Sequence, residues 1–278
     1  MIKVAIIGKF GYLGHNLKKY LQKKKNINLK AFSYEEFCNI KNINTFSFII
    51  NAAINKKFIE NKYNKNLDID LKISNKIFDT NCKFIFLSTR KIYSNVPNIK
   101  EESKLKPQDL YAKNKVISER QCFKVLNKKL IILRIPNIIG GEIKNNRKVR
   151  VSFYENYLKI IKKKNKFFYE NYYKDFISME QFCKIILKIL KSNLNGIYNV
   201  SLGKKIYIKE LLSWLNFANK DKKLFVESAH KLKNENFYLN NTKISKTLNI
   251  KIKKIELKKY CIYLSKKIFK NEYHKKIR

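Results

Sequence analysis

The sequence is poor in the residues that build metal sites and disulfide frameworks, and it has no long apolar run. Three of its 278 residues are histidine and five are cysteine, and the cysteines lie scattered at positions 38, 82, 122, 183 and 261. This distribution argues against a structural zinc site and against disulfide staples. No apolar run reaches the ~18 residues of a membrane helix, and Met1–Ile7 is too short for a signal-peptide core. We therefore expect a cytoplasmic protein without a metal or a membrane partner.

Acidic residues are also few, and the formal net charge is +41. Such a charge is typical of nucleic-acid binders, which gain affinity from phosphate contacts. Yet nearly all the basic residues are lysine, whereas arginine, which makes bidentate contacts to bases, occurs only six times. The abundance of lysine, asparagine and isoleucine is typical of an AT-rich coding sequence. We therefore predict that nucleic acid is not a partner, although the positive field would attract an anionic substrate.

Glycine occurs seven times, and three of the glycines follow one another at fixed spacing: Gly8, Gly11 and Gly14. A buried strand pattern over Lys3–Ile7 precedes them, and a helical pattern over Tyr12–Lys24 follows. Glycines in such a turn let the backbone approach a ligand closely, and the helix N-terminus favours a pyrophosphate. An ordinary strand-to-helix connection needs one glycine rather than three. The turn therefore predicts dinucleotide binding.

The first half of the chain continues this alternation of strand and helix. The patterns predict strands at Asn28–Phe32, Phe46–Asn51, Lys83–Ser88 and Leu130–Arg134, and helices at Leu67–Asp79 and Pro107–Asn127. Repeated β-then-α units imply a parallel sheet with helices on both faces. The predicted fold class is therefore α/β, a Rossmann-type doubly wound parallel sheet, with ligands beyond the carboxyl ends of its strands.

The end of the second strand commonly distinguishes NAD from NADP. An acidic residue there binds the ribose of NAD, and a basic residue accommodates the phosphate of NADP. Here Ala31-Phe32 runs into Ser33-Tyr34-Glu35, with no acid at the strand end itself. The lack of an acidic residue at the strand end favours NADP, whereas Glu35 is near enough in sequence to reach the ribose of NAD. The sequence leaves NAD and NADP open as alternatives.

A second motif is a tyrosine followed four residues later by a lysine. It occurs at Tyr20/Lys24, Tyr111/Lys115 and Tyr263/Lys267. Both residue types are so frequent that about this many matches are expected by chance. Only the middle pair opens a helix pattern downstream of a strand that ends in Ser88-Thr89. Because residues four apart share one helix face, Lys115 can reach under the ligand that Tyr111 touches.

With these residues the chain resembles the extended short-chain dehydrogenase/reductases, the NAD-dependent epimerase/dehydratase family, in which Y-x-x-x-K is the catalytic pair. Further segments match the family in order and spacing over most of the chain. They are the turn Ile6–Gly14, Asn51-Ala52-Ala53 after the third strand, Asn66 before a helix, Leu133–Gly140 (L-R-x-x-N-x-x-G), Lys174–Ile177 (K-D-F-I where R-D-F-I is usual) and Gly196–Leu211 (G-x-Y-N-V…G…E-L).

The resemblance implies roles for the matched residues. Tyr111 would move a proton at a sugar oxygen, Lys115 would favour the phenolate and bind the nicotinamide ribose, and Thr89 would orient the reacting oxygen. These three are the expected catalytic residues. NAD or NADP would be held by Gly8, Gly11, Tyr12, Leu13, Gly14, Asn51, Ala52, Ala53, Asn66, Tyr111 and Lys115. Substrate binding would involve Ser88, Thr89, Asn137 and Lys174, and no residue is expected to bind a metal.

One departure from the family narrows the reaction. Sugar-nucleotide 4,6-dehydratases of the family carry an Asp-Glu pair after the threonine, where this chain has Arg90-Lys91. Two cations cannot supply the acid and base of water elimination, so a dehydratase of that type is disfavoured. A 4-epimerase and a 4-keto reductase remain. The compact length leans towards reductases such as dTDP-4-dehydrorhamnose reductase, although the aspartate usual in that enzyme is also missing.

The resemblance also divides the chain. Residues 1–170, with 172–200 returning to them, would form the NAD(P)-binding Rossmann domain. Residues 201–278, with a contribution from 142–170, would form a smaller C-terminal substrate-binding domain. Helical patterns at Met179–Leu190, Lys209–Phe217 and Leu257–Lys270 are expected to be amphipathic and packed.

The expected function is that of an NAD(P)-dependent oxidoreductase or epimerase of a nucleotide-activated sugar, in surface polysaccharide biosynthesis. Its partners would be the nucleotide sugar and, by the resemblance, a second copy in a homodimer. The alternative is a non-catalytic protein on the same fold that binds a dinucleotide or nucleic acid. The intact Thr89, Tyr111 and Lys115 argue against that alternative.

Overall fold

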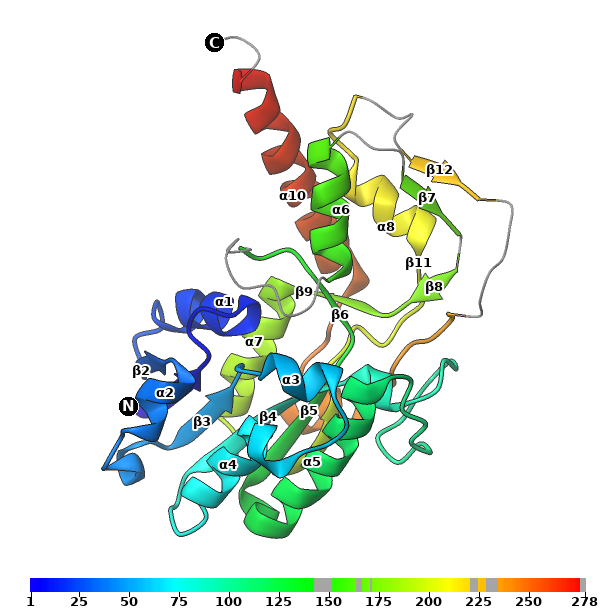
Figure 1. Ribbon diagram of the computed structural model, residues 1–278. Coiled ribbons are helices and arrows are strands. Elements are labelled where there is room, and N and C mark those ends of the chain that lie inside the picture. The colour runs from blue at the N-terminus through cyan, green and yellow to red at the C-terminus, as the bar shows by residue number, and fades with distance from the viewer. Residues whose placement is uncertain (143–151, 164–166, 171, 221–224, 229–234, 276–278) are drawn as a thin grey trace.

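The computed structural model describes residues 1–142, 152–163, 167–170, 172–220, 225–228 and 235–275. At its centre lies a six-stranded sheet whose neighbouring strands are all parallel (Figure 1). In spatial order the strands are β10 (Gly196–Asn199), β5 (Leu130–Ile135), β4 (Lys83–Thr89), β3 (Phe48–Asn51), β1 (Ile2–Ile7) and β2 (Ile27–Phe32). Runs such as Leu130–Ile135 are buried at every residue, as expected for strands covered on both faces.

Helices cover both faces of the sheet. One face packs against α1 (Tyr12–Leu21) and α7 (Met179–Leu190), whose Leu17 and Phe182 join the largest hydrophobic cluster. The other face packs against α2 (Tyr34–Cys38), α4 (Ile69–Lys76) and α5 (Leu110–Leu126). The short α3 (Lys56–Glu60) lies beside α5 (Figure 1). The predicted Rossmann-type α/β fold is confirmed.

The winding of the chain reverses at β1. This strand lies between β2 and β3, so the chain crosses from β1 to one side first and then continues on the other. In open parallel sheets, ligands bind beyond the carboxyl ends of the strands at such a reversal. The residues at this point are Gly8, directly after β1, and Asn51-Ala52-Ala53 at the end of β3.

A second hydrophobic cluster lies apart from the sheet. It joins α6 (Phe153–Lys163), α8 (Ile208–Leu215) and α10 (Lys254–Lys275), which Figure 1 shows above the central sheet. Around and below these helices lie three two-stranded pairs. They are β6 (Asn137–Ile139) with β9 (Phe176–Ser178), β7 (Phe167–Tyr169) with β12 (Phe225–Glu227), and β8 (Tyr173–Lys174) with β11 (Ile206–Tyr207). The helix α9 (Thr242–Leu248) returns to the main cluster through Ile244.

The predicted strands agree with the structure within two residues at each end, and the helix at Met179–Leu190 agrees at both ends. The prediction that Pro107 lies in the first turn of its helix is wrong. The helix α5 begins at Leu110 because Asp109 caps it, accepting a 2.8 Å hydrogen bond from the Ala112 N–H. The C-terminal helix begins three residues earlier than the apolar pattern indicates, at Lys254.

Candidate active site

The glycine turn folds tightly onto the end of β3. Gly8 has a φ of +92°, and a Cβ added there would lie 2.6 Å from the Ala53 nitrogen. A Cβ at Gly14 would lie 2.2 Å from the carbonyl oxygen of Gly8. A side chain is thus excluded at both positions by backbone atoms. Because only glycine fits here, the backbone of the turn itself is presented at the point where the winding reverses.

The start of α1 supplies backbone donors rather than side chains. The first hydrogen bond of the helix runs from the His15 N–H to the carbonyl of Gly11, so the N–H groups of Tyr12, Leu13 and Gly14 precede the intrahelical ladder. The Leu13 side chain packs against the main hydrophobic cluster. The Tyr12 hydroxyl donates to the carbonyl of Gly140, and burial raises the pKa of Tyr12 well above its usual value. The residues predicted to bind the cofactor here therefore present main-chain groups, and the Tyr12 and Leu13 side chains are engaged inside the protein.

The end of β2 carries charges of both signs. Ser33 and Glu36 form a capping box at the start of α2. The Lys9 ammonium, from the glycine turn, lies 2.5 Å from a carboxylate oxygen of Glu36 and lowers the pKa of that residue. This strand end therefore carries both an acid, Glu36, which could bind a ribose hydroxyl, and a cation, Lys9, which could bind a phosphate. NAD and NADP remain alternatives.

Thr89 and Tyr111 are brought to one corner of the sheet. Thr89 ends β4, and its Oγ1 accepts a hydrogen bond from the Lys91 N–H at 3.2 Å, so the hydroxyl keeps its own proton for donation. Lys91 lies on the short 3-10 helix η3 (Arg90–Ile92), and its ammonium binds Asp109, the cap of α5, at 2.8 Å. Tyr111 is the second residue of that helix and is partly buried. The Lys91–Asp109 ion pair therefore links the end of β4 to the start of α5.

The Lys115 side chain lies one turn further along α5 and is 4% exposed. Its ammonium lies 2.7 Å from Oδ2 of Asp70 and 4.3 Å from the centre of the Phe86 ring. Burial alone would lower the pKa of Lys115, but the charge and hydrogen bond of Asp70, together with the charges of Tyr111 and Asp68, raise it. Burial likewise raises the pKa of Asp70, opposed by Lys115 and by a hydrogen bond from Asn51. We expect the pair to be fully charged at neutral pH because the two ions touch.

The Ser88 hydroxyl is engaged inside the protein. It donates to Glu119 on α5, which also forms a buried ion pair of 2.7 Å with Arg134 on β5. Arg134 in turn donates to the Tyr93 hydroxyl at 2.5 Å. This cluster joins β4, β5 and α5. Of the two hydroxyls in the Ser88-Thr89 pair, Thr89 is the one that this cluster leaves out.

The other predicted site residues lie at varying distances from this corner. Asn137 begins β6 and donates to the carbonyl of Asp175 at 3.3 Å. Lys174 pairs with Glu235, and its ammonium lies 4.6 Å from the centre of the Tyr172 ring; burial lowers the pKa of Lys174. Asn66 is exposed on the 3-10 helix η2 (Lys65–Leu67).

Asp175 ties the two halves of the chain together. It is fully buried, and its carboxylate accepts from the backbone N–H groups of Leu202, Gly203 and Leu239 at 3.0 to 3.3 Å. Burial raises the pKa of Asp175 to about 7, while these donors oppose the rise. A folded-state pKa above the unfolded value of 3.8 means that the folded chain binds the extra proton between about pH 4 and pH 7.

This linkage gives a pH prediction. The contribution of Asp175 to stability rises as the pH falls from about 7 towards 4. We expect the unfolding free energy of the wild type, relative to Asp175→Asn, to gain about 2 kcal/mol between pH 7.5 and pH 5. Urea denaturation of both proteins at each pH measures the difference, and the other titrating groups cancel. A difference that does not change with pH would show that the three N–H donors keep the carboxylate ionised throughout.

Three acidic residues at this corner were not predicted from the sequence: Asp68, Asp70 and Glu119. Asp68 caps α4 and accepts from the hydroxyls of Tyr63 and Ser118 at 3.1 and 2.9 Å. A signal was present, because two acids at alternate positions directly after Asn66 are unusual in a chain with only 21 acidic residues. Asp70 and Asp68 have partners 45 and 50 residues away, Lys115 and Ser118, which periodicity does not reveal.

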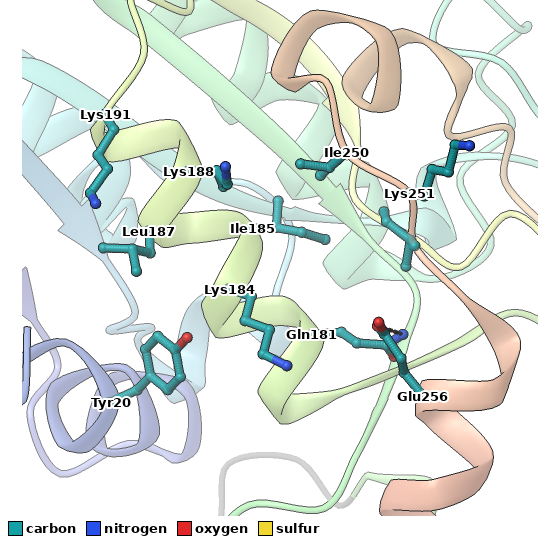
Figure 2. A pocket seen from close by; sticks show the side chains of 11 residues that line it. Tyr20, Gln181, Lys184, Ile185, Leu187, Lys188, Lys191, Ile250, Lys251 and Glu256 are labelled. Carbon is teal, nitrogen blue, oxygen red and sulfur yellow. Dashed lines mark hydrogen bonds between the residues drawn. The ribbon is translucent and has the colours of Figure 1, made fainter.

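A pocket of about 300 Å³ lies elsewhere, between α1, α7 and the segment that joins α9 to α10 (Figure 2). Apolar side chains such as Ile185, Ile250 and Ile252 line it, together with lysines such as Lys184 and Lys188. None of its lining residues belongs to the predicted site. In the described part of the chain, no group of three His, Cys, Asp or Glu side chains is placed to hold a metal, and no helix is long and apolar enough to cross a membrane.

A glycine turn at the winding reversal and a tyrosine–lysine pair one turn apart on α5 are the pattern that the resemblance to short-chain dehydrogenase/reductases leads us to expect. The model of the NAD-dependent epimerase/dehydratase family matches residues 4–201. The chain belongs to this family. No match was found among the curated proteins.

Solved structures share the fold at low sequence identity. A UDP-N-acetylglucosamine 4-epimerase from Methanobrevibacter ruminantium is 18% identical, with a TM-score of 0.75 and coverage of 98% of this chain and 99% of that one. A UDP-glucuronic acid 4-epimerase from Bacillus cereus, in complex with NAD, is 14% identical (TM-score 0.75, coverage 96% and 100%). A dTDP-4-dehydrorhamnose reductase from Clostridium acetobutylicum is 16% identical (TM-score 0.72, coverage 95% and 99%).

Proposed function

We propose that this chain is an NAD(P)-dependent enzyme that transfers a hydride at a nucleotide-activated sugar. The observation that carries the proposal is the juxtaposition of two features. A glycine cradle (Gly8, Gly11 and Gly14) lies at the winding reversal, and a Cβ at Gly8 or Gly14 would clash with its backbone. Thr89 ends β4 at the same edge of the sheet, and Tyr111 and Lys115 lie on α5, whose start is tied to that strand end by the Lys91–Asp109 contact. Membership of the family and the fold shared with epimerases and a reductase support it.

The cradle residues fit a dinucleotide by their chemistry. The N–H groups at the start of α1 bind its pyrophosphate, Gly8, Gly11 and Gly14 let the backbone approach it, and Asn51-Ala52-Ala53 flank it. Lys115 holds the nicotinamide ribose by a hydrogen bond from its ammonium. The nicotinamide, when bound, accepts or supplies the hydride. Asn66, whose side chain is exposed on η2, completes the proposed set of cofactor-binding residues on the family resemblance.

The side chains at the corner handle the proton and the substrate. Tyr111 gives a proton to, or takes one from, the sugar oxygen at the reacting carbon. Thr89 donates a hydrogen bond to the same oxygen and orients it. Asn137 and Lys174 bind the nucleotide diphosphate of the substrate. The Ser88 hydroxyl serves the substrate only indirectly, by fixing β4 against Glu119.

The reaction is a 4-epimerisation or a 4-keto reduction. After Thr89, where a dehydratase of the family needs an acid and a base, this chain has two cations that are already engaged. The Arg90 guanidinium lies 3.8 Å from the centre of the Phe237 ring, and Lys91 binds Asp109. We propose that residues 201–278, with 142–170, form the substrate-binding domain and that the product enters surface polysaccharide biosynthesis.

The proposal is tested by direct turnover. The purified protein is incubated with NAD and UDP-glucuronic acid or UDP-N-acetylglucosamine, and separately with NADPH and a dTDP-4-keto-6-deoxy sugar. Epimer formation, detected by NMR, assigns an epimerase, whereas oxidation of NADPH, detected at 340 nm, assigns a reductase. Failure of every pair, together with RNA or DNA binding that falls steeply with salt, would favour the non-catalytic alternative.

A further inference from the structure

Asp70 links the end of β3 to the catalytic lysine. Its Oδ2 accepts from the Lys115 ammonium at 2.7 Å, and its Oδ1 accepts from the Asn51 side-chain amide at 2.6 Å. Asn51 in turn accepts from the Ala53 N–H at 2.9 Å. A continuous chain of polar contacts thus runs from the segment beside the glycine turn to the helix that carries Tyr111.

The Asp70–Lys115 pair is enclosed, so water screens it little. The two side chains are 5% and 4% exposed, and the Phe86 ring lies against the ammonium. The second carboxylate nearby, Asp68, is held by the hydroxyls of Tyr63 and Ser118. In a low-dielectric site, a paired ammonium and a lone ammonium present very different fields to a neighbouring ligand. A ligand bound beside Lys115 therefore experiences the net charge of the Asp70–Lys115 ion pair rather than that of a lone ammonium.

Asp70 is also in a favourable place for a carboxylate. It lies in the first turn of α4, where the N-terminal end of the helix dipole favours negative charge. The long stem of Lys115 has many rotamers, and the ion pair selects one of them. Asp70 therefore both directs the ammonium and offsets its charge.

We propose that Asp70 is a positioning residue that fixes Lys115 and balances its charge, and that it thereby sets the preference of the site between the oxidised and the reduced dinucleotide. The inference rests on the proposed function, because it requires that the glycine turn binds NAD or NADP. The oxidised nicotinamide is a cation and the reduced one is neutral. When Asp70 neutralises the charge of Lys115, the site tolerates the cationic nicotinamide. Without Asp70, the Lys115 ammonium repels it.

The test is the ratio of two binding constants, which needs no sugar substrate. Calorimetry gives Kd for NAD⁺ and for NADH on the full-length protein, and likewise for the NADP pair if that form binds. In Asp70→Asn we expect the ratio Kd(NAD⁺)/Kd(NADH) to rise about tenfold, the order of effect of one uncompensated charge in a poorly screened site. In the charge-retaining control Asp70→Glu we expect a ratio within about twofold of wild type.

A second variant decides the matter even if Asp70→Asn does not fold. Asp70→Asn combined with Lys115→Met removes both charges, and buried ion pairs often tolerate neutral replacement. We expect weaker binding of both forms but an unchanged ratio, because the pair was already balanced. A ratio moved tenfold towards NAD⁺ would show that Lys115 acts as an uncompensated cation in the wild type and would overturn the proposal.

The remaining outcomes are also decisive. If Asp70→Asn folds and weakens both forms equally, Asp70 has only a structural role and the inference is wrong, while the proposed function stands. If the wild-type protein binds no dinucleotide at all, the proposed function fails, and the inference fails with it.

Discussion

Replacing Tyr111 with phenylalanine is expected to lower kcat about a thousandfold while leaving dinucleotide affinity within about threefold of wild type. The change removes one hydroxyl and therefore the proton that must move to or from the sugar oxygen. The phenyl ring keeps the packing of the first turn of α5, and Asp109 still caps that helix through the Ala112 N–H. Turnover of the nucleotide sugar that the wild type accepts, measured alongside dinucleotide titration, separates chemistry from binding.

The chain offers a matched control in Tyr263→Phe. Tyr263 also precedes a lysine by four residues, but its side chain is 58% exposed on α10. We expect the Tyr263 variant to keep full activity. Equal losses in both variants, or full activity in Tyr111→Phe, would contradict the assignment of Tyr111 as the proton-transfer residue.

Replacing Gly14 with alanine is expected to weaken dinucleotide binding ten- to a hundredfold. The new Cβ would lie 2.2 Å from the carbonyl oxygen of Gly8, a backbone atom that cannot swing away like a flexible side chain. The start of α1 must then shift away from the turn, at a cost of about 1–3 kcal/mol. The N–H groups proposed to bind the pyrophosphate move with it. Calorimetric titration with NAD(H) and NADP(H) measures the loss.

Two other glycines serve as controls that separate a steric clash in the glycine turn from general destabilisation of the fold. At Gly11 a Cβ would meet its nearest atom at 3.3 Å, so Gly11→Ala should weaken binding much less than Gly14→Ala. Gly196 has a φ of +88° but no atom within 4 Å of an added Cβ, so Gly196→Ala reports the cost of backbone strain alone. We expect Gly196→Ala to lower the melting temperature without changing affinity. Similar affinity losses in all three would show that general destabilisation, not the cradle, is responsible.

The sheet could be predicted from the sequence because its signal is local. Continuous apolar runs such as Leu130–Leu133 form strands covered on both faces, and their alternation with helical patterns indicates a parallel sheet. The glycine turn could also be predicted from the sequence. Three glycines at this spacing, in a chain with only seven, indicate a turn whose backbone a ligand approaches closely. The capping role of Asp109 was not predicted, because Pro107, a residue type common in the first turn of a helix, places the expected start three residues before Leu110.

The partners of the catalytic residues could not be predicted in the same way. The pattern Y-x-x-x-K places Lys115 on the same helix face as Tyr111, but the carboxylate that holds Lys115 comes from another helix, 45 residues earlier. Likewise, the sequence does not show that the Ser88 hydroxyl donates its hydrogen bond to Glu119 inside the protein. Such contacts depend on how α5 packs against α4 and β4, and no spacing within a single element specifies them.

The central claim is that the glycine turn binds a nicotinamide dinucleotide, and one measurement tests it most directly. The purified protein is denatured, any released dinucleotide is identified by mass spectrometry, and the protein that carries none is titrated with NAD(H) and NADP(H). We predict one dinucleotide per chain, either released or bound on titration. Released NAD would favour a 4-epimerase, and an empty protein that binds NADPH would favour a 4-keto reductase. A folded protein that neither releases nor binds any of the four forms would contradict the account.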